Sequence, residues 1–261
     1  MKDELFSVEE QVVIVSGGSR GIGRAIAQGF AERGAQVIVT GREAETIQRT
    51  AREIAPAGNP VRPVVCDIAK LDHIESLVGT VMDECGHVDT LVNVAGVNRR
   101  KPAVDYTEED YDFVMDVNLK GSFFLSQAVG RHMVEQGSGC QINVASINTD
   151  RPLKYVLPYA ATKAGMNHMT RSLAMEWGPH GVRVNAIGPG FTVTALTRKL
   201  WEHDELRHWA LAHTPQKRLG QPEDMVGAAL FLASPASAFM TGQILYIDGG
   251  ITAGFSWPIP M

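Results

Sequence analysis

Short apolar segments alternate with helical segments along almost the whole chain, and this alternation limits the possible folds more than any other feature. Each apolar segment has the length of a strand, and the stretches between them carry the apolar spacing of helices. Strands joined through helices lie parallel in a sheet that helices cover on both faces. We therefore expect a doubly wound α/β fold with about seven strands, at residues 11–16, 36–40, 61–66, 88–93, 141–145, 182–187 and 243–247.

The composition is that of a globular chain with one sizeable core. Of 261 residues, 44% are hydrophobic and 20% charged, and the formal net charge is −5. We expect a single domain over residues 1–261 in the cytoplasm, because the sequence shows neither a membrane-length apolar run nor a secretory leader. The three cysteines are widely spaced and odd in number, and the eight histidines form no HxxxH or HExxH pair, so the sequence predicts no disulfide framework and no metal site. The mild acidity gives no reason to expect nucleic acid or a membrane as partner.

A glycine-rich turn follows the first predicted strand. Residues 17–23 read Gly-Gly-Ser-Arg-Gly-Ile-Gly, and the apolar spacing of a helix begins at Ile22. Glycines permit a tight turn and let backbone amides approach a pyrophosphate, whose charge also suits a helix amino terminus. Glycine turns also join strands to helices for structural reasons alone. The segment by itself therefore only favours nucleotide binding.

Tyr159 and Lys163 are four residues apart in a predicted helix over residues 158–177, and Ser146 lies thirteen residues before the tyrosine. The spacing of four places the phenol and the ammonium on one helix face. A tyrosine that acts as general acid or base near neutral pH needs a lowered pKa, which a nearby positive charge can provide. We expect Lys163 to lower the pKa of Tyr159, although such pairs are also common on exposed helices.

Taken together, these motifs resemble the short-chain dehydrogenase/reductase family from about residue 11 to residue 250. Ser16 departs from the family's usual threonine, and Val94 from its usual asparagine. The resemblance implies a Rossmann-type fold and an oxidoreductase that transfers a hydride between a nicotinamide and a carbonyl or secondary alcohol carbon. It is carried, in chain order, by Gly17 to Gly23, Asp67 with Ile68, Asn93 to Gly96, Asn118, Ser146, Tyr159 with Lys163, and Pro189 with Gly190.

The resemblance also implies catalytic roles. Tyr159 would exchange the proton, and Lys163 would also hold the nicotinamide ribose. Ser146 would bind the reacting oxygen of the substrate. Asn118 would hold a water that resupplies Lys163 with protons, and the alternative for Asn118 is a buried structural asparagine.

Cofactor binding is implied for a second set of residues. Asp67 and Ile68 would contact adenine, although Asp67 could equally cap the helix that follows. Asn93 is expected to serve mainly structure. The expected cofactor-binding residues are Gly17, Ser19, Arg20, Gly21, Ile22, Gly23, Arg42, Asp67, Ile68, Asn93, Ala95, Gly96, Tyr159, Lys163, Pro189, Gly190 and Thr194.

The loop after the second predicted strand bears on the choice of cofactor. It reads Thr40-Gly41-Arg42, with no carboxylate before Glu43 to bind a ribose 2′-hydroxyl. Arg42, together with Arg20, could instead pair with a 2′-phosphate. We expect NADP(H) to be preferred, with NAD(H) possible if Arg42 is only a solvated side chain.

Three segments are expected to line the substrate pocket, at residues 97–101, 148–157 and 191–214. Asn98, Arg99 and Arg151 could bind a carboxylate or a polyol, and Phe191 belongs to an apolar lid in the third segment. Residues 95–102 resemble the gluconate 5-dehydrogenase branch, whose members interconvert gluconate and 5-ketogluconate. The alternatives are a 3-oxoacyl-carrier-protein reductase, a general ketone reductase and, outside the enzymes, a nucleotide-binding regulator.

The resemblance further implies a homotetramer or a homodimer. A helix predicted over residues 110–136 has apolar residues on more than one face, as an interface helix would. The apolar tail over residues 251–261 could cross to a neighbouring subunit or fold back on its own.

Overall fold

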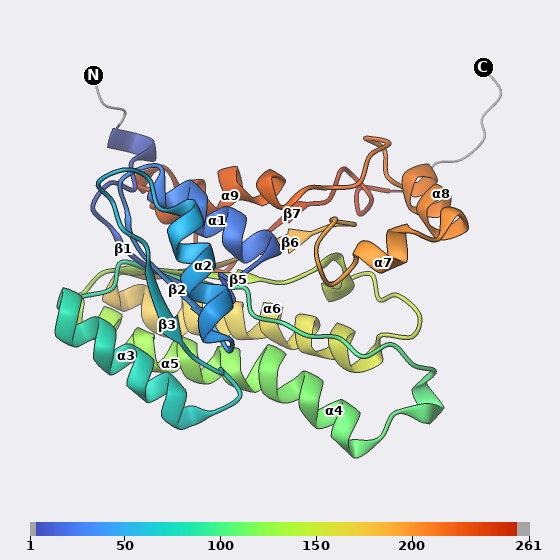
Figure 1. Ribbon diagram of the computed structural model, residues 1–261, viewed down its shortest axis with the longest axis horizontal. Coiled ribbons are helices and arrows are strands. Elements are labelled where there is room, and N and C mark those ends of the chain that lie inside the picture. Colours follow the sequence, from blue (N-terminus) through green and yellow to red (C-terminus); the bar gives the residue numbers. More distant parts are fainter. Residues whose placement is uncertain (1–3, 255–261) are drawn as a thin grey trace.

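The computed structural model describes residues 4–254, which form a parallel sheet between two layers of helices (Figure 1). The strand order is β3-β2-β1-β4-β5-β6-β7, so the predicted α/β fold with about seven strands is confirmed. Strand ends differ from the predicted ones by at most two residues. The strands are β1 (Val12–Ser16), β2 (Gln36–Gly41), β3 (Arg62–Val65), β4 (Thr90–Asn93), β5 (Gly139–Val144), β6 (Val182–Pro189) and β7 (Ile244–Ile247).

The helices divide between the two faces of the sheet (Figure 1). One face is covered by α1 (Gly21–Ala31), α2 (Ala44–Ile54) and α9 (Val226–Ala233). The other is covered by α3 (Leu71–Cys85), α5 (Ser122–Gln136) and α6 (Leu157–Trp177), with α4 (Glu108–Met115) before α5. The short helices α7 (Arg198–Trp201) and α8 (Asp204–His213) lie to one side, beyond the carboxyl end of β6.

Short 3-10 helices occupy several connections, and one of them is separated from the end of β5 by two residues. They lie at Glu4–Phe6, Ala103–Asp105, Ile147–Thr149, Gly178–His180, Pro222–Met225 and Pro235–Ser237. None of the helices within residues 4–254 is long and apolar enough to cross a membrane. Residues 255–261 of the predicted apolar tail lie outside the described residues.

Alternate residues of β1 enter two separate cores. Val13 and Val15 pack with side chains of α1 and α9, whereas Val12 and Ile14 pack with side chains of α3 and α5. All four are completely buried. Successive side chains of a strand point to opposite faces, so a strand covered on both faces is apolar at most of its positions. This explains why β1 appears in the sequence as a nearly continuous apolar run.

The strand order reverses at β1, with β2 and β3 on one side and β4 to β7 on the other. Loops that leave neighbouring strands in opposite directions open a crevice at the carboxyl ends of those strands. Most of the sequence motifs lie at this edge. Gly17 follows β1, Arg42 follows β2, Val94 follows β4 and Ser146 comes shortly after β5.

The helix predicted over residues 110–136 is interrupted, which corrects the expectation of a continuous helix. Between α4 and α5 the chain makes a π-helical turn, Asp116–Gly121. Within that turn Asn118 is completely buried, and its side chain is hydrogen-bonded to the backbone of Val97. Apolar spacing in the sequence does not distinguish a π turn from an α turn, because only one residue is added.

Candidate active site

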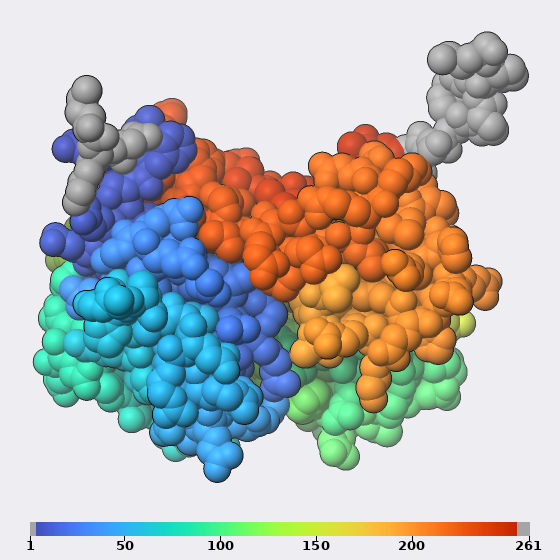
Figure 2. Space-filling view, turned by 45° about the horizontal axis from the view of Figure 1, so that its top comes forward, coloured from blue at the N-terminus to red at the C-terminus, as the bar shows by residue number. Residues whose placement is uncertain are grey.

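The loops at the carboxyl ends of the strands surround a cleft of about 1270 Å³. In Figure 2 the surface is hollowed between the amino-terminal part of the chain, in blue, and the segment around α7 and α8, in orange. The glycine turn lines the cleft together with Ser146, Tyr159 and residues of the 191–214 segment. Both halves of the predicted site therefore meet in one cavity.

The glycine turn brings the amino terminus of α1 close to the loop after β4. Gly17 has a φ of 75°, and a Cβ atom on it would lie 2.7 Å from the backbone of Ala95. A Cβ atom on Gly23 would lie 2.3 Å from the carbonyl oxygen of Gly17. Side chains at these two positions would therefore collide with backbone, so glycine is required for this approach.

The amino terminus of α1 has no side-chain cap. Arg20 occupies the cap position without a capping hydrogen bond, and the first turn holds no acidic residue. The unpaired amides and the helix dipole give this end a partial positive charge that suits a phosphate. The residues at this end of the cleft therefore fit the pyrophosphate of a dinucleotide.

Arg20 and Arg42 are both exposed and line the same cleft, as do Asp67 and Ile68. The Asp67 carboxylate accepts a hydrogen bond from the backbone N–H of Ala69 at 3.2 Å, in the turn before α3. The N-cap of α3 is Lys70 and has no side-chain capping hydrogen bond, so Asp67 lines the cleft and holds the turn before the helix but does not cap the helix as the alternative expected. Two guanidinium groups at this end would suit an additional phosphate.

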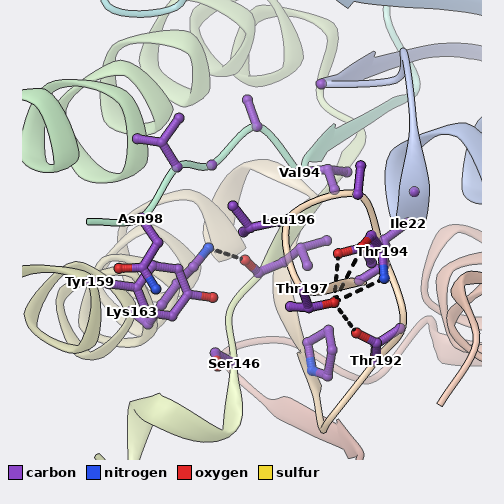
Figure 3. A pocket seen from close by; sticks show the side chains of 18 of the residues that line it. Ile22, Val94, Asn98, Ser146, Tyr159, Lys163, Thr192, Thr194, Leu196 and Thr197 are labelled. Carbon is purple, nitrogen blue, oxygen red and sulfur yellow. Dashed lines mark hydrogen bonds between the residues drawn. The ribbon is translucent and has the colours of Figure 1, made fainter. Parts of the chain in front are cut away.

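The predicted triplet comes together where β5 ends and α6 begins. Tyr159 and Lys163 lie on one face of α6, and Ser146 approaches them from the segment after β5 (Figure 3). The Lys163 ammonium lies 5.7 Å from the centroid of the Tyr159 ring. It donates a hydrogen bond of 2.6 Å to the carbonyl oxygen of Val144, the last residue of β5. The structure therefore groups the three side chains as the spacing predicted.

The electrostatics differ from the prediction that Lys163 lowers the pKa of Tyr159. Burial raises the pKa of Tyr159 because it disfavours the phenolate, while a hydrogen bond from Ser146 and the charge of Arg100 act in the opposite direction. Burial also lowers the pKa of Lys163 to about 8. The sequence could not show this, since the burial of both groups depends on segments far away in the chain.

Asn118 does not line the cleft. Its amide accepts from the N–H of Val97 at 2.8 Å and donates to the C=O of Val97 at 2.9 Å, and it also donates to Thr162 at 3.3 Å. Both amide hydrogens are therefore used within the protein. These contacts favour the alternative of a buried structural asparagine that fixes the loop after β4. Asn93 is likewise buried, with bonds to Ser126 and Asn143, in keeping with its expected structural role.

Two of the predicted substrate residues lie outside the cleft. The Arg99 guanidinium lies 4.5 Å from the centroid of the Phe113 ring, and its Nε is 3.8 Å from Asp110. Arg151 is exposed and does not line the cleft either. Arg100 and Lys154 line it instead. Neighbouring residues of an irregular loop point to different sides, and their order in the sequence does not show which side is which.

The segment over residues 191–214 forms an apolar wall of the cleft. The ring centroid of Phe191 lies 5.6 Å from that of Trp201 and 5.8 Å from that of Trp209, and all three residues line the cavity. The base of the segment is held by Thr197, whose hydroxyl donates to the carbonyl of Thr192 at 2.6 Å (Figure 3). The predicted positions of Phe191 and Thr194 at the cleft agree with the structure.

Asn148 lines the cleft, as expected of the 148–157 segment, but sequence reasoning missed that it is buried beside Ser146 and bonded to it. An asparagine two residues after a serine is a common turn pattern, so the sequence alone gives no signal for this contact. Within the described residues, no group of three or more histidine, cysteine or acidic side chains is arranged to hold a metal ion.

Comparison with known proteins identifies the family. Residues 17–252 match the family described as "Enoyl-(Acyl carrier protein) reductase". Gluconate 5-dehydrogenase of Gluconobacter oxydans is 37% identical over 249 residues, which cover 95% of this chain and 97% of that protein. The chain belongs to the short-chain dehydrogenase/reductase family. It is therefore an oxidoreductase of the nicotinamide-dependent class.

Other members of the short-chain dehydrogenase/reductase family are similar over the same length. The 5-keto-D-gluconate 5-reductase of Escherichia coli is 34% identical and covers 95% of this chain and 98% of its own. The crystal structure of a gluconate 5-dehydrogenase from Burkholderia cenocepacia in complex with NADP and tartrate is 34% identical, with a TM-score of 0.93. That likeness covers 97% of this chain and 99% of the other.

Proposed function

We propose that the protein is an NADP(H)-dependent oxidoreductase that interconverts gluconate, or a similar sugar acid, with its 5-keto form. The observation that carries this proposal is the presence of Ser146, Tyr159 and Lys163 in the same cleft as the glycine turn. The similarity to gluconate 5-dehydrogenase and 5-keto-D-gluconate 5-reductase supports the substrate class. The solved relative with bound NADP supports the cofactor.

The proposed chemistry assigns one task to each side chain. A bound nicotinamide supplies or accepts the hydride. In reduction, Tyr159 gives its phenolic proton to the carbonyl oxygen, and Ser146 donates a hydrogen bond to that oxygen as negative charge develops on it. Lys163 would hold the ribose of a bound nicotinamide and would return a proton to Tyr159. Because burial raises the pKa of Tyr159, the free enzyme holds it as the phenol, which is the form that reduction requires.

The test is turnover by the purified protein, followed through the absorbance of the nicotinamide. Gluconate is offered with NADP and then with NAD, and 5-ketogluconate is offered with NADPH. Turnover of either substrate that is faster with the phosphorylated cofactor supports the proposal. If the protein turns over other ketones but neither of these sugar acids, the proposed substrate class is wrong and the assignment as a reductase still holds.

Cofactor preference is expected to depend on Arg42. Arg42→Ala removes one proposed partner of the 2′-phosphate, and a charge-assisted hydrogen bond of this kind contributes about 2 kcal/mol. The preference for NADPH over NADH, measured as the ratio of kcat/KM values, should therefore fall about 30-fold. Arg49→Ala is the matched control, because Arg49 is an exposed arginine of α2 that does not line the cleft. An unchanged ratio in Arg42→Ala would contradict the proposed contact.

The apolar wall favours a second candidate substrate, a less polar ketone. Trp201, Trp209 and Leu196 line the same cavity as Arg100 and Lys154. A sugar acid would use the two cations for its carboxylate, whereas an alkyl ketone would gain most from the indole rings. The two candidates therefore differ in which wall provides the binding energy.

Two substitutions distinguish these candidates. Trp209→Ala should lower kcat/KM about 10-fold for a medium-chain 3-oxo ester, because burying an alkyl chain on the indole contributes about 1.4 kcal/mol. The same substitution should lower kcat/KM less for 5-ketogluconate. Arg100→Ala should lower kcat/KM more for 5-ketogluconate than for the 3-oxo ester. Measuring both variants on both substrates decides the matter. If Trp209→Ala costs more turnover of the sugar acid than Arg100→Ala does, the less polar substrate class is the better one.

We further propose a homotetramer in the cytoplasm. Large apolar side chains are exposed on α4, α5 and α6, including Tyr111, Phe123 and Met175, of which Met175 is 79% exposed. Such exposure is typical of faces that pack against another subunit. Light scattering at micromolar concentration tests the assembly; a dimeric mass would favour the homodimer instead, and a monomeric mass would reject both assemblies.

A further inference from the structure

The Ser146 hydroxyl oxygen accepts two hydrogen bonds from a single residue. The backbone N–H of Asn148 donates to Ser146 Oγ at 3.1 Å, and the side-chain Nδ2 of Asn148 donates to the same oxygen at 3.3 Å. Ser146 and Asn148 are each only 7% exposed, so water has little access to either. A hydroxyl oxygen has two lone pairs and one proton. Both acceptor positions of Ser146 are therefore filled, and its proton is left to be donated.

The orientation of the Asn148 amide is fixed by a third hydrogen bond. The backbone N–H of Leu153 can only donate, and it donates to Asn148 Oδ1 at 3.0 Å. The carbonyl end of the amide must therefore face Leu153, and the NH2 end must face Ser146. The same bond ties Asn148 to the 150–156 loop, which lines the cleft through Leu153 and Lys154.

We propose that Asn148 is a positioning residue that locks Ser146 as a hydrogen-bond donor toward Tyr159 and the reacting oxygen of the substrate. This inference rests on the proposed function, because it specifies the direction in which Ser146 acts. If an acceptor position of Ser146 were open, its hydroxyl oxygen could accept a hydrogen bond from the Tyr159 hydroxyl. The Ser146 proton could then point elsewhere, and the substrate oxygen would have no donor. With Asn148 in place, the hydroxyl donates to the phenol oxygen in the free enzyme and to the substrate oxygen in the complex.

Asn148→Asp replaces the side-chain donor to Ser146 by an acceptor of nearly the same shape. An ionised carboxylate cannot donate, so the Ser146 proton turns toward it and away from the site. The loss of one donor to a developing oxyanion costs about 10²-fold in kcat. As the pH falls and the new carboxyl takes up a proton, it donates again. The ratio of wild-type to variant kcat for ketone reduction should therefore shrink toward acid pH.

Other ionisable side chains near Ser146 could also affect how the rates depend on pH. They are Tyr159 and Lys163 on α6, Arg100 in the loop after β4, Lys154 and Asp150 in the loop after Ser146, and Tyr246 of β7, which is bonded to Asp150. All of these are unchanged between wild type and variant, so the ratio of rates removes their shared contribution. The direct charge of the new carboxylate is removed by repeating the comparison in a Ser146→Ala background.

A second readout needs no turnover. The pKa of Tyr159 is measured by ultraviolet difference titration of each protein against its own Tyr159→Phe counterpart. Asn148→Asp should raise the pKa of Tyr159 in the presence of Ser146 and raise it clearly less in the Ser146→Ala background. If wild type turns over no hydroxy acid or ketone, the proposed function fails, and this titration still tests the lock.

Two results would overturn the inference: a rate ratio that does not change with pH, or an effect of Asn148→Asp that is equally large without Ser146. Thermal melting shows whether the variant folds. If it does not, Asn148→Ala is used, which keeps the backbone donor and leaves one acceptor position of Ser146 open. That variant should lose about 10-fold in kcat, and should lose nothing further in the Ser146→Ala background.

Discussion

Replacing Tyr159 by phenylalanine is expected to reduce kcat about 10³-fold in both directions of the reaction, since this change removes the proton that the phenol exchanges. The ring itself is kept, so the affinity for NADPH, measured by fluorescence titration, should change little. Tyr155→Phe is the matched control, because Tyr155 lines the same cleft but is 60% exposed. Turnover in Tyr159→Phe within 10-fold of wild type would contradict the role of Tyr159.

The raised pKa of Tyr159 also predicts how the two directions depend on pH. Reduction uses the phenol, which predominates at neutral pH, whereas oxidation uses the phenolate, whose fraction grows as the pH rises toward the pKa. In the wild type, oxidation should therefore accelerate with rising pH, while reduction should stay level until the pH approaches the raised pKa of Tyr159. The residual rates of Tyr159→Phe should lose this dependence.

Replacing Lys163 by methionine is expected to abolish turnover and to stabilise the fold at the same time. Burial lowers the pKa of Lys163 from 10.5 to about 8, so holding the charged ammonium in the folded state costs about 3 kcal/mol. The hydrogen bond to Val144 compensates for only part of the lost hydration. Methionine has a similar length and no charge to desolvate. The free energy of unfolding at pH 7 should therefore rise by up to about 3 kcal/mol.

The sign of the pH dependence distinguishes this explanation from a general packing effect. Below pH 8 lysine is protonated in both states, so the folded wild type bears the whole penalty. Between pH 8 and 10.5 the folded state has lost the proton and the unfolded state has kept it, so the penalty declines as the pH rises. The stability gap between wild type and Lys163→Met should close over this window in denaturant unfolding without cofactor.

Lys120→Met is the control for the stability measurement, because Lys120 is an exposed lysine paired with Asp116. It should change the free energy of unfolding by less than about 1 kcal/mol at every pH. A stability gap between wild type and Lys163→Met that is the same at pH 7 and at pH 10.5 would show that burial of the charge is not its cause.

The sequence predicted the fold well because the central strands β1, β4, β5 and β6 are buried on both faces. Val12 to Val15 are apolar at each position for that reason, and the apolar runs mark the strands with little ambiguity. The motif residues were also predictable as a group, because they follow strand ends that a parallel sheet brings to one edge. Ser146, Tyr159 and Lys163 line one cavity on this account.

The sequence did not predict the properties that depend on side-chain direction and burial. Arg99 and Arg100 are neighbours of equal charge, yet only Arg100 lines the cleft, because Arg99 packs on Phe113. The upward pKa shift of Tyr159 results from burial by several segments at once. The bond between Asn148 and Ser146 depends on a single turn of 3-10 helix, which apolar spacing does not reveal.

The central place of β1 has a consequence for the synthesis of the chain. Its second neighbour, β4, ends at Asn93, so a nascent chain must grow past that residue before both edges of β1 are paired. Until then a strand with four apolar residues in a row has an open edge on the ribosome, which is the condition under which chains associate wrongly or bind chaperones. We expect this early interval of translation, more than the later addition of residues 191–214, to limit the yield of folded protein in cells.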